Sequence, residues 1–356
     1  MIKNRILSLQ ENLNDNEAFW ITSDSNRFYL TGFNSSAGSV LITKSSAVFF
    51  IDFRYFEKAK CTVDSCKVVL YDRGDKGIYE YCKQQNICEI FIEASQISLT
   101  RHKYLSELFE GIDISKENKL DIKLGEMRAV KSEYELKFIK QAQSLTEQTL
   151  DYILPRITIG RTEREIMLDM EFFMRGLGAD GVSFDFIVVS GKNSSLPHGV
   201  PTNKKIEKGD FVTMDFGAIV NGYCSDMTRT VAIGNITDEQ KLVYDTTLKA
   251  QLSAIDAIKA GAVCGDIDKI ARDIIYDAGY KGCFGHALGH SVGIDVHESP
   301  NLSPNNKVVL TVGNVVTVEP GIYLENKFGV RIEDMVYVTE NGCINLTNSD
   351  KNLIIL

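Results

Sequence analysis

Residues 214–228 have the sequence Met214-Asp-Phe-Gly-Ala-Ile-Val-Asn-Gly-Tyr-Cys-Ser-Asp-Met-Thr228. Asn221-Gly222 lies between two runs of β-forming residues, and this dipeptide is the strongest short-range signal for a β-hairpin. With these two residues in the turn, Asp215 lies opposite Thr228. Residues directly opposite share a face of the sheet, as do residues two apart on one strand. Asp215 and Asp226 are therefore expected on one face, roughly 7–8 Å apart at the backbone.

This pair of carboxylates predicts a metal site. The hairpin core offers no cationic neighbour, so the two groups repel each other unless a cation or a proton lies between them. Asp226 alone would also suit a turn or a helix cap. Asp215 lies in the middle of a predicted strand, where Asp is depleted, and this favours metal binding by the pair.

The composition is that of a globular protein with more than one domain. The chain has 356 residues, of which 44% are apolar and 24% are charged. A net charge of −9 argues against nucleic acid or a membrane surface as the main partner. We expect neither a signal peptide nor a membrane-spanning stretch. Eight Cys residues without a Cys-x-x-Cys pair predict reduced thiols in the cytoplasm.

The chain divides into two predicted domains, residues 1–122 and 123–356. Short strands and helices alternate through the first, which indicates an α/β layer structure. In the second, Ser132, Thr162 and Thr237 each precede a Glu or Gln by three residues, and these capping boxes predict the starts of three helices. A fourth helix is expected after Asp266. The order of two helices and a sheet, twice over, is the layout of an internal duplication, although no repeat of residues supports it.

Three of the five His residues lie within Gly285-His-Ala-Leu-Gly-His-Ser-Val-Gly-Ile-Asp-Val-His-Glu298. On a helix, His286 and His290 would face one metal ion, as in zinc proteases. The repeated glycines argue instead for an irregular segment whose backbone passes close to another group. We therefore expect one metal ligand, with His290 as the central candidate, and supporting or substrate-binding roles for His286 and His297.

Glu319 and Glu333 both lie in apolar, β-rich runs of the sequence. An unpaired carboxylate buried there would cost several kcal/mol, so each needs a cation. Arg331 could pair with one of them, and strand parity places Arg331 and Glu333 on the same face. The register between the two glutamates is not predicted, because Pro320 interrupts the strand.

These residues supply four carboxylates and one imidazole: Asp215, Asp226, His290, Glu319 and Glu333. Oxygen-rich ligation with one nitrogen suits Mn²⁺, Co²⁺, Zn²⁺ or Fe²⁺. Five side chains are too many for one catalytic ion that keeps an open position. They suit two ions about 3.5–4 Å apart that share bridging carboxylates, which is a hydrolytic arrangement.

The five residues stand in motifs that resemble the pita-bread metallopeptidases. These motifs are Met214-Asp-Phe-Gly217, Ser225-Asp-Met-Thr-Arg-Thr230, Gly289-His-Ser-Val-Gly-Ile-Asp-Val-His-Glu298, Val318-Glu-Pro-Gly-Ile-Tyr323 and Val330-Arg-Ile-Glu-Asp334. Within that family the chain is similar to the Xaa-Pro peptidases, namely Xaa-Pro aminopeptidase (aminopeptidase P) and Xaa-Pro dipeptidase (prolidase). Asn26-Arg-Phe-Tyr-Leu-Thr-Gly-Phe33 and Asp52-Phe-Arg-Tyr55 resemble the creatinase-like N-terminal domain of the group.

The resemblance implies a mixed α/β (α+β) fold. A creatinase-like α/β domain is followed by a catalytic domain with a curved antiparallel sheet covered by helices. It also implies that Asp226 and Glu333 bridge two metal ions. Asp215 binds one ion, and His290 and Glu319 bind the other. A hydroxide shared by the ions attacks the carbonyl before proline, and Glu319 carries the proton to the departing nitrogen.

Four further residues receive roles from the resemblance. His198 and His297 match the histidines that steady the substrate and the tetrahedral intermediate, while His286 and Arg331 match substrate-side positions. His198 lies in a loop containing Pro and Gly directly before the Asp hairpin. An ordinary surface His is the alternative interpretation of that position.

The resulting expectation is an Xaa-Pro aminopeptidase with two divalent ions per chain, Mn²⁺ first among them. Its substrate would be a peptide with proline second, and the family implies a homodimer. A dipeptide-specific Xaa-Pro dipeptidase is the alternative. A methionine aminopeptidase would lack the N-terminal domain, and a creatinase-like hydrolase would lack the carboxylate set. A non-catalytic binding homologue would be expected to have lost ligands.

Overall fold

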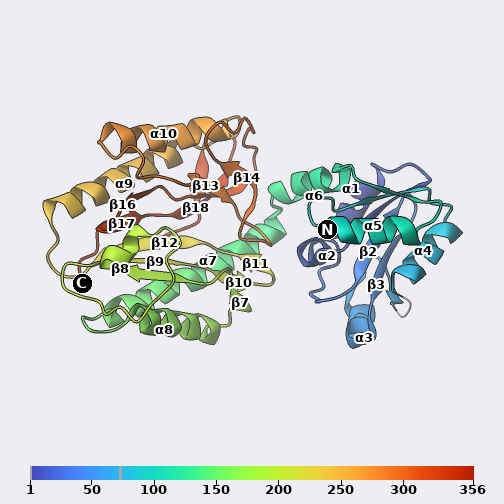
Figure 1. Cartoon of the computed structure of the whole chain (residues 1–356), viewed down its shortest axis with the longest axis horizontal. Helices are drawn as coiled ribbons and strands as arrows, with labels where there is room; N and C mark the ends of the chain where they lie inside the picture. Colours follow the sequence, from blue (N-terminus) through green and yellow to red (C-terminus); the bar gives the residue numbers. More distant parts are fainter. Residues whose placement is uncertain (1, 72–73) are drawn as a thin grey trace. The chain divides into compact units, whose positions relative to one another are not determined.

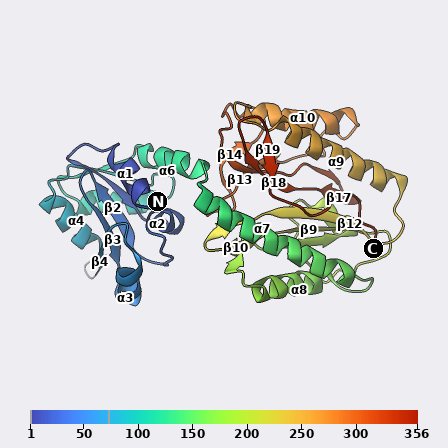
Figure 2. The same cartoon turned by 180° about the vertical axis from the view of Figure 1, so that it is seen from behind.

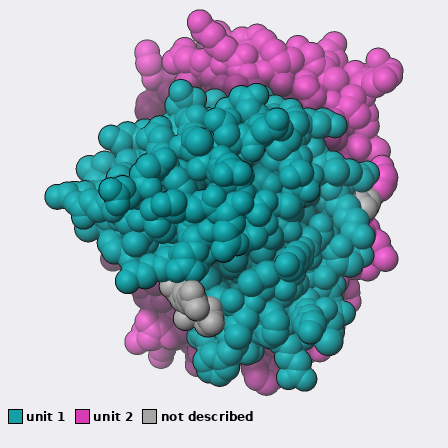
Figure 3. Space-filling model, turned by 90° about the vertical axis from the view of Figure 1, so that its right-hand side faces the viewer, with its two compact units in different colours: residues 1–127 teal, residues 128–356 magenta. Residues whose placement is uncertain are grey.

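The computed structural model describes residues 2–71 and 74–356. The chain divides into two compact units, Met1–Met127 and Arg128–Leu356, which Figure 3 shows in different colours. The division falls later than residue 122, where the sequence placed it, and both positions lie within helix α6 (Lys119–Ala129). In the described part of the chain, no helix has the length and apolar character needed to cross a membrane.

The first unit is a mixed sheet with helices, in strand order β4-β3-β2-β1-β5-β6 (Figure 1). β1 pairs antiparallel with β2 and parallel with β5. The core is mainly aliphatic and includes a few aromatic rings, of which Trp20 and Phe109 have centroids 5.5 Å apart. Its elements are α1 (Ile2–Gln10), β1 (Glu17–Ile21), α2 (Asp24–Thr31), β2 (Ser39–Thr43), β3 (Ala47–Ile51), α3 (Phe53–Thr62), β4 (Lys67–Leu70), α4 (Asp75–Gln84), β5 (Glu89–Ile92), α5 (Leu99–Leu108), β6 (Asp113–Ser115) and α6.

The second unit holds four antiparallel sheets between two pairs of helices. Its helices are α7 (Glu133–Ile153), η1 (Leu154–Arg156), α8 (Glu163–Gly176), η2 (Gly191–Ser195), α9 (Asp238–Ala257) and α10 (Cys264–Asp277). Its strands are β7 (Gly181–Val182), β8 (Ile187–Ser190), β9 (Phe211–Phe216), β10 (Ala218–Val220), β11 (Tyr223–Cys224), β12 (Met227–Ala232), β13 (Gly289–Ser291), β14 (Glu298–Leu302), β15 (Val315–Val318), β16 (Gly321–Leu324), β17 (Phe328–Arg331), β18 (Asp334–Val338) and β19 (Cys343–Asn345).

The four long helices begin close to the predicted positions. Ser132, Thr162 and Thr237 are the N-caps of α7, α8 and α9, each with a capping box. α10 begins at Cys264, earlier than the predicted start after Asp266. Pairing of Val263 with Val309 ends the extended segment at that point, so the helix starts directly after it.

The Asp hairpin has the register that the sequence predicts. Asp215 pairs with Thr228, and Val220 pairs with Tyr223. Asn221 and Gly222 have φ values of 48° and 77°, which are the left-handed conformations that a two-residue hairpin turn requires. Gly217 interrupts the first arm, and Ser225 and Asp226 interrupt the second, without a change of register.

Strand alternation separates an apolar face from a polar face in two of these sheets. In the sheet β12-β9-β8, Met214 and Phe216 lie in a core with residues of α7 and α8, so Asp215 faces the other way. In the sheet β14-β13-β15-β18-β19, Val316 and Val318 lie in a core with residues of α9 and α10. Figures 1 and 2 show one helix pair on each side of the strands. The polar faces of the two sheets therefore line the space between them.

The second hairpin brings the two glutamates together. Val318 pairs with Asp334, and Gly321 pairs with Arg331. These pairs keep one register on both sides of Pro320, which places Glu319 opposite Glu333. The structure thus supplies the register that Pro320 hides in the sequence.

Gly217→Ala is expected to destabilise the second unit. A Cβ at residue 217 would lie 1.9 Å from the carbonyl oxygen of Ser225, so the hairpin arms must move apart. Such overpacking costs about 3 kcal/mol. Calorimetric unfolding measures the loss. In the matched control Gly176→Ala, the added Cβ meets nothing within 4 Å, and stability should rise by up to about 1 kcal/mol. Equal stability of the two variants would contradict the assigned close approach.

Candidate metal centre

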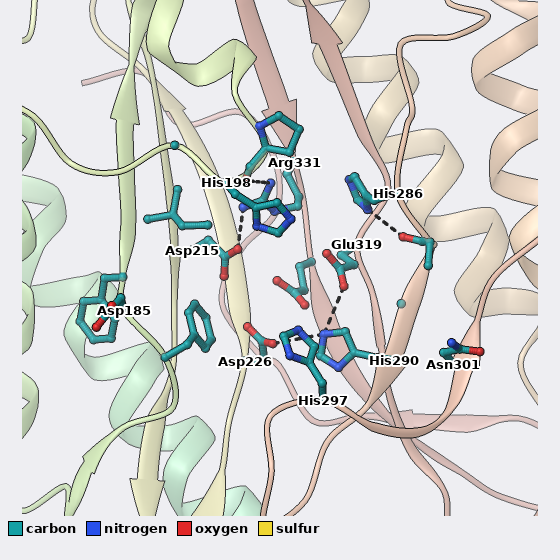
Figure 4. A pocket seen from close by; sticks show the side chains of 18 of the residues that line it. Asp185, His198, Asp215, Asp226, His286, His290, His297, Asn301, Glu319 and Arg331 are labelled. Carbon is teal, nitrogen blue, oxygen red and sulfur yellow. Dashed lines mark hydrogen bonds and ion pairs between the residues drawn. The ribbon is translucent and has the colours of Figure 1, made fainter. Parts of the chain in front are cut away.

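A cavity of about 770 Å³ opens between the polar faces of the two sheets in the second unit (Figure 4). Strands and loops far apart in the sequence supply its lining. All the residues that the sequence singled out lie on it: Asp215, Asp226, His290, Glu319, Glu333, His198, His286, His297 and Arg331.

Four of the five expected ligands gather at one point of the cavity. Asp226, His290 and Glu333 each offer a ligand atom, and these atoms lie within 4.8 Å of one another. The Nε2 atom of His290 is 3.3 Å from Oε1 of Glu319 and 3.6 Å from Oδ2 of Asp226. Asp215 lies outside the closest group, because Arg331 holds one of its oxygens.

Three carboxylate oxygens in this cluster are buried without a hydrogen-bond partner: Asp215 Oδ1, Asp226 Oδ1 and Glu333 Oε1. Buried polar atoms are nearly always paired, and an unpaired charged oxygen is costly. Oxygens that point into a shared cavity with an imidazole are the donor set of a divalent cation. The residues present therefore fit a metal centre.

The pKa values show how strongly the cluster needs a positive charge. Burial and the neighbouring carboxylates raise the pKa of Asp226 and of Glu333 well above their usual values. Burial alone would also raise the pKa of Glu319, but the hydrogen bond and charge of His290 hold it below its usual value. Burial alone would lower the pKa of His290, and Glu319 raises it instead. Without a cation, protonation of Asp226 and Glu333 is therefore favoured, because it relieves the repulsion between the carboxylates.

Backbone contacts fix the orientation of His290. Nδ1 of its ring lies 3.1 Å from the carbonyl oxygen of Ser291, which leaves Nε2 toward the carboxylates. Its backbone N–H donates to Oγ1 of Thr317 at 3.0 Å. A Cβ on the preceding Gly289 would lie 2.0 Å from the carbonyl oxygen of Thr317, so only glycine permits this approach. The segment is the short strand β13, in agreement with the prediction that it is not helical.

Arg331 is the buried cation of the cavity wall. Its Nη2 donates to Oδ2 of Asp215 at 2.6 Å, and its Nε donates to Oγ1 of Thr228 at 3.1 Å. From the sequence, Arg331 could pair with Glu319 or Glu333, but its carboxylate partner in the structure is Asp215. Asp215 also has a cationic neighbour that the hairpin by itself does not provide. That neighbour comes from a strand more than a hundred residues away.

Tyr323 lies behind the cavity wall in contact with Arg331 and His286, and it was not predicted from the sequence. Its hydroxyl accepts from Nη1 of Arg331 at 2.7 Å and lies 3.0 Å from Nε2 of His286. Burial raises the pKa of Tyr323 to about 12 and lowers the pKa of His286. The available signal was strand parity: β16 pairs with β17, which puts Tyr323 on the same face as Arg331.

His198 and His297 line the cavity on either side of the ligand cluster (Figure 4). The ring of His297 lies 4.4 Å from the ring of His290, centroid to centroid. Burial and the charge of His290 lower the pKa of His297. His198 lies in the loop after η2, where the neighbouring Pro197 carbonyl accepts from Nη1 of Arg331 at 3.1 Å. Both imidazoles are therefore placed to meet a molecule bound in the cavity.

The sequence model described as metallopeptidase family M24 matches residues 137–340. The chain belongs to this family. A second model, described as the creatinase/prolidase N-terminal domain, matches residues 5–130. The protein is thus an M24 metallopeptidase with a creatinase-type first unit and a pita-bread second unit, and the family uses divalent metal. The predicted fold class and family resemblance are confirmed.

Three relatives match this M24 chain over nearly its whole length. The Xaa-Pro dipeptidase of Pyrococcus horikoshii is 37% identical over 342 residues, which cover 96% of this chain and 95% of that protein. The Xaa-Pro dipeptidase structure from Bacillus anthracis has a TM-score of 0.94 at 38% identity, covering 100% of this chain and 99% of that one. The X-Pro aminopeptidase structure from Thermotoga maritima has a TM-score of 0.90 at 37% identity, covering 98% and 100%.

Metal should stabilise the protein more at alkaline than at acid pH. The raised pKa values of Asp226 and Glu333 favour the folded metal-free protein below their usual pKa, and this contribution is lost as pH rises through the raised values. A bound cation offsets the repulsion that then appears. The rise in Tm on adding Mn²⁺ to metal-stripped protein should be larger at about pH 8 than at about pH 5. An equal or larger rise at the acid pH would contradict this account.

Proposed function

We propose that this protein is an Xaa-Pro aminopeptidase, which hydrolyses the bond before a proline in the second position of a peptide. The observation that carries the proposal is the set of three unpaired, buried carboxylate oxygens around His290 in one cavity. Relatives named Xaa-Pro dipeptidase and X-Pro aminopeptidase support the choice of peptide bond.

Two divalent ions per chain are proposed, with Mn²⁺ first and Co²⁺, Zn²⁺ or Fe²⁺ as alternatives. Asp226 and Glu333 would be shared between the ions, Asp215 would hold one, and His290 and Glu319 would hold the other. Divalent ions in such a pair acidify water and polarise the scissile carbonyl. The donor set of four carboxylates and one imidazole suits these hard or borderline ions.

The protein's own groups would handle the proton and the substrate. Glu319 has a lowered pKa and is ionised near neutrality, so it can accept a proton and pass it to the departing nitrogen. His297 has a lowered pKa and is neutral, so its ring N–H can donate to the carbonyl oxygen as negative charge develops. His198 would act from the other side, and His286 and Arg331 would form the substrate-side wall.

Xaa-Pro dipeptidase is the second candidate, because relatives of equal similarity carry that name. The two activities differ in whether a chain continues after the proline. Kinetics on an Xaa-Pro dipeptide and on a pentapeptide with proline second separate them. A higher kcat/KM on the pentapeptide supports the aminopeptidase, and turnover of the dipeptide alone supports the dipeptidase.

Asp226→Asn is expected to abolish turnover of Xaa-Pro dipeptides and Xaa-Pro-Yaa tripeptides by Mn²⁺-loaded protein. A shared ligand is lost, and even groups that only support metal ligands cost 10–100-fold, so kcat/KM should fall by more than about a hundredfold. Elemental analysis should show two equivalents of metal in the wild type and less in the variant. Absence of turnover on both peptide classes by metal-loaded wild-type protein would contradict the proposal.

His198→Ala serves as the companion variant, because it removes a hydrogen-bond donor and leaves the five ligands in place. Its kcat should fall by about 10²-fold, as when one donor to a developing oxyanion is removed. Its metal content should equal that of the wild type. A loss of metal in His198→Ala would contradict the substrate-side role.

A cytoplasmic homodimer is the proposed working form. The family resemblance supports the dimer, and eight free cysteines support a reducing compartment. Sedimentation equilibrium of the full chain at micromolar concentration should give twice the mass of 39.8 kDa. A single species at the monomer mass would remove the dimer proposal.

A further inference from the structure

Glu163 is a buried carboxylate that stands apart from the metal ligands. It lies in the first turn of α8 and is 0% exposed. Its oxygens accept from the backbone N–H of Ser190 at 2.6 Å and from the backbone N–H of Thr202 at 3.0 Å. They also accept from the hydroxyls of the same two residues, at 2.9 Å and 2.6 Å, and from Nδ2 of Asn193 at 3.1 Å. A single carboxylate therefore joins two points of the chain twelve residues apart.

The segment between those two points forms one wall of the cavity. Pro197, His198, Gly199, Val200 and Pro201 all line it. A loop of this length costs free energy to close, and its shape must be fixed by contacts because η2 is its only described helical part. Hydrogen bonds to an ionised carboxylate are about twice as strong as neutral ones. Glu163 thus links the two ends of the segment through hydrogen bonds.

Two other contacts also hold this segment. The backbone N–H of Gly329 in β17 donates to Oγ of Ser194 at 2.9 Å. Nζ of Lys204 donates to Oγ of Ser190 at 3.1 Å, next to the Glu163 contact. The segment is therefore fixed between α8 and β17, and β17 also carries Arg331.

Helix capping does not explain this carboxylate. The cap of α8 is formed by Thr162 and Glu165: the N–H of Thr162 donates to Oε2 of Glu165 at 2.7 Å, and the N–H of Glu165 donates to Oγ1 of Thr162 at 3.2 Å. Glu163 is left for the loop alone. Burying a charge is costly unless many hydrogen bonds offset it, and here five donor groups do so.

We propose that Glu163 is a positioning residue for catalysis: it ties both ends of residues 190–202 and so places His198 on the substrate side of the cavity. This inference rests on the proposed peptidase function. Small displacements of a catalytic group cost about 10²-fold in rate. The carboxylate acts through His198 and does not itself line the cavity.

Glu163→Gln tests the inference, because the new amide NH₂ faces donors and loses part of the bonding. Turnover of an Xaa-Pro-Yaa tripeptide should fall about tenfold in kcat/KM, with metal content unchanged. In a His198→Ala background the same change should cost less than about twofold, because the group being positioned is already gone. Hydrogen exchange of the backbone in residues 191–201 should become faster, and this readout does not depend on activity.

Glu135→Gln is the matched control. Glu135 is also a buried carboxylate in the first turn of a helix, α7, where it completes the capping box with Ser132. This change should leave exchange in residues 191–201 as in the wild type, and its effect on kcat/KM should be additive with His198→Ala. If Glu163→Gln does not fold, Asn193→Ala and Thr202→Val remove one donor each at the two ends and should give the same signs with smaller changes.

The outcomes are distinguishable. Unchanged exchange in residues 191–201, additivity with His198→Ala, or loss of metal in Glu163→Gln would each overturn the positioning role. Absence of turnover in the metal-loaded wild type would refute the proposed function instead. In that case the exchange experiment still reports whether Glu163 fixes the loop.

Discussion

The main constraint on this structure is the free-energy cost of burying several carboxylates close together in one cavity. Asp215, Asp226 and Glu333 are 8%, 4% and 1% exposed, and they share a cavity with Glu319. Two like charges 4 Å apart repel by about 4 kcal/mol at an effective dielectric constant of 20. A domain is stable by only about 5–15 kcal/mol in total, so an uncompensated cluster would take a large part of that. The surrounding fold must therefore hold the carboxylates together, and a bound cation would reduce the repulsion between them.

The free energy that holds the carboxylates together comes from apolar burial on the outer faces of the two sheets that line the cavity. Met214 and Phe216 on one strand, and Val316 and Val318 on another, are fully buried against helices, and each apolar residue fixes the polar one beside it. A slip by one residue would expose these side chains and turn the carboxylates into the core, which is far more costly than the repulsion. Ligand placement is thus a by-product of apolar burial on the opposite face. That explains how an unfavourable cluster persists in a stable fold.

Local signals in the sequence were sufficient for some features and insufficient for others. Asn221-Gly222 determines its own turn, so the register of Asp215 follows without knowledge of the rest of the chain. Pro320 cannot form a ladder hydrogen bond, so the register of the two glutamates depends on pairing on both sides of it. Arg331 contacts Asp215, and Tyr323 contacts His286, only because segments distant in sequence come together. Glu163 was not predicted for the same reason. Its sequence position is typical of a glutamate in the first turn of a helix, and only the folded loop after β8 supplies its hydrogen-bond donors.

Arg331 joins the expected metal ligands and the proposed substrate side of the cavity into one network. Its Nη2 holds Asp215, while its Nη1 reaches both the Tyr323 hydroxyl and the Pro197 carbonyl. A lysine could not serve both sides, because a single ammonium lacks the planar fork that directs donors along two lines. A shift of the loop that carries His198 would therefore move Arg331 and, through it, Asp215, which is an expected metal ligand. Glu163 holds both ends of that loop, so two buried charges, Arg331 and Glu163, act on the same short segment. Together they fix the expected metal ligands and the proposed substrate side of the cavity.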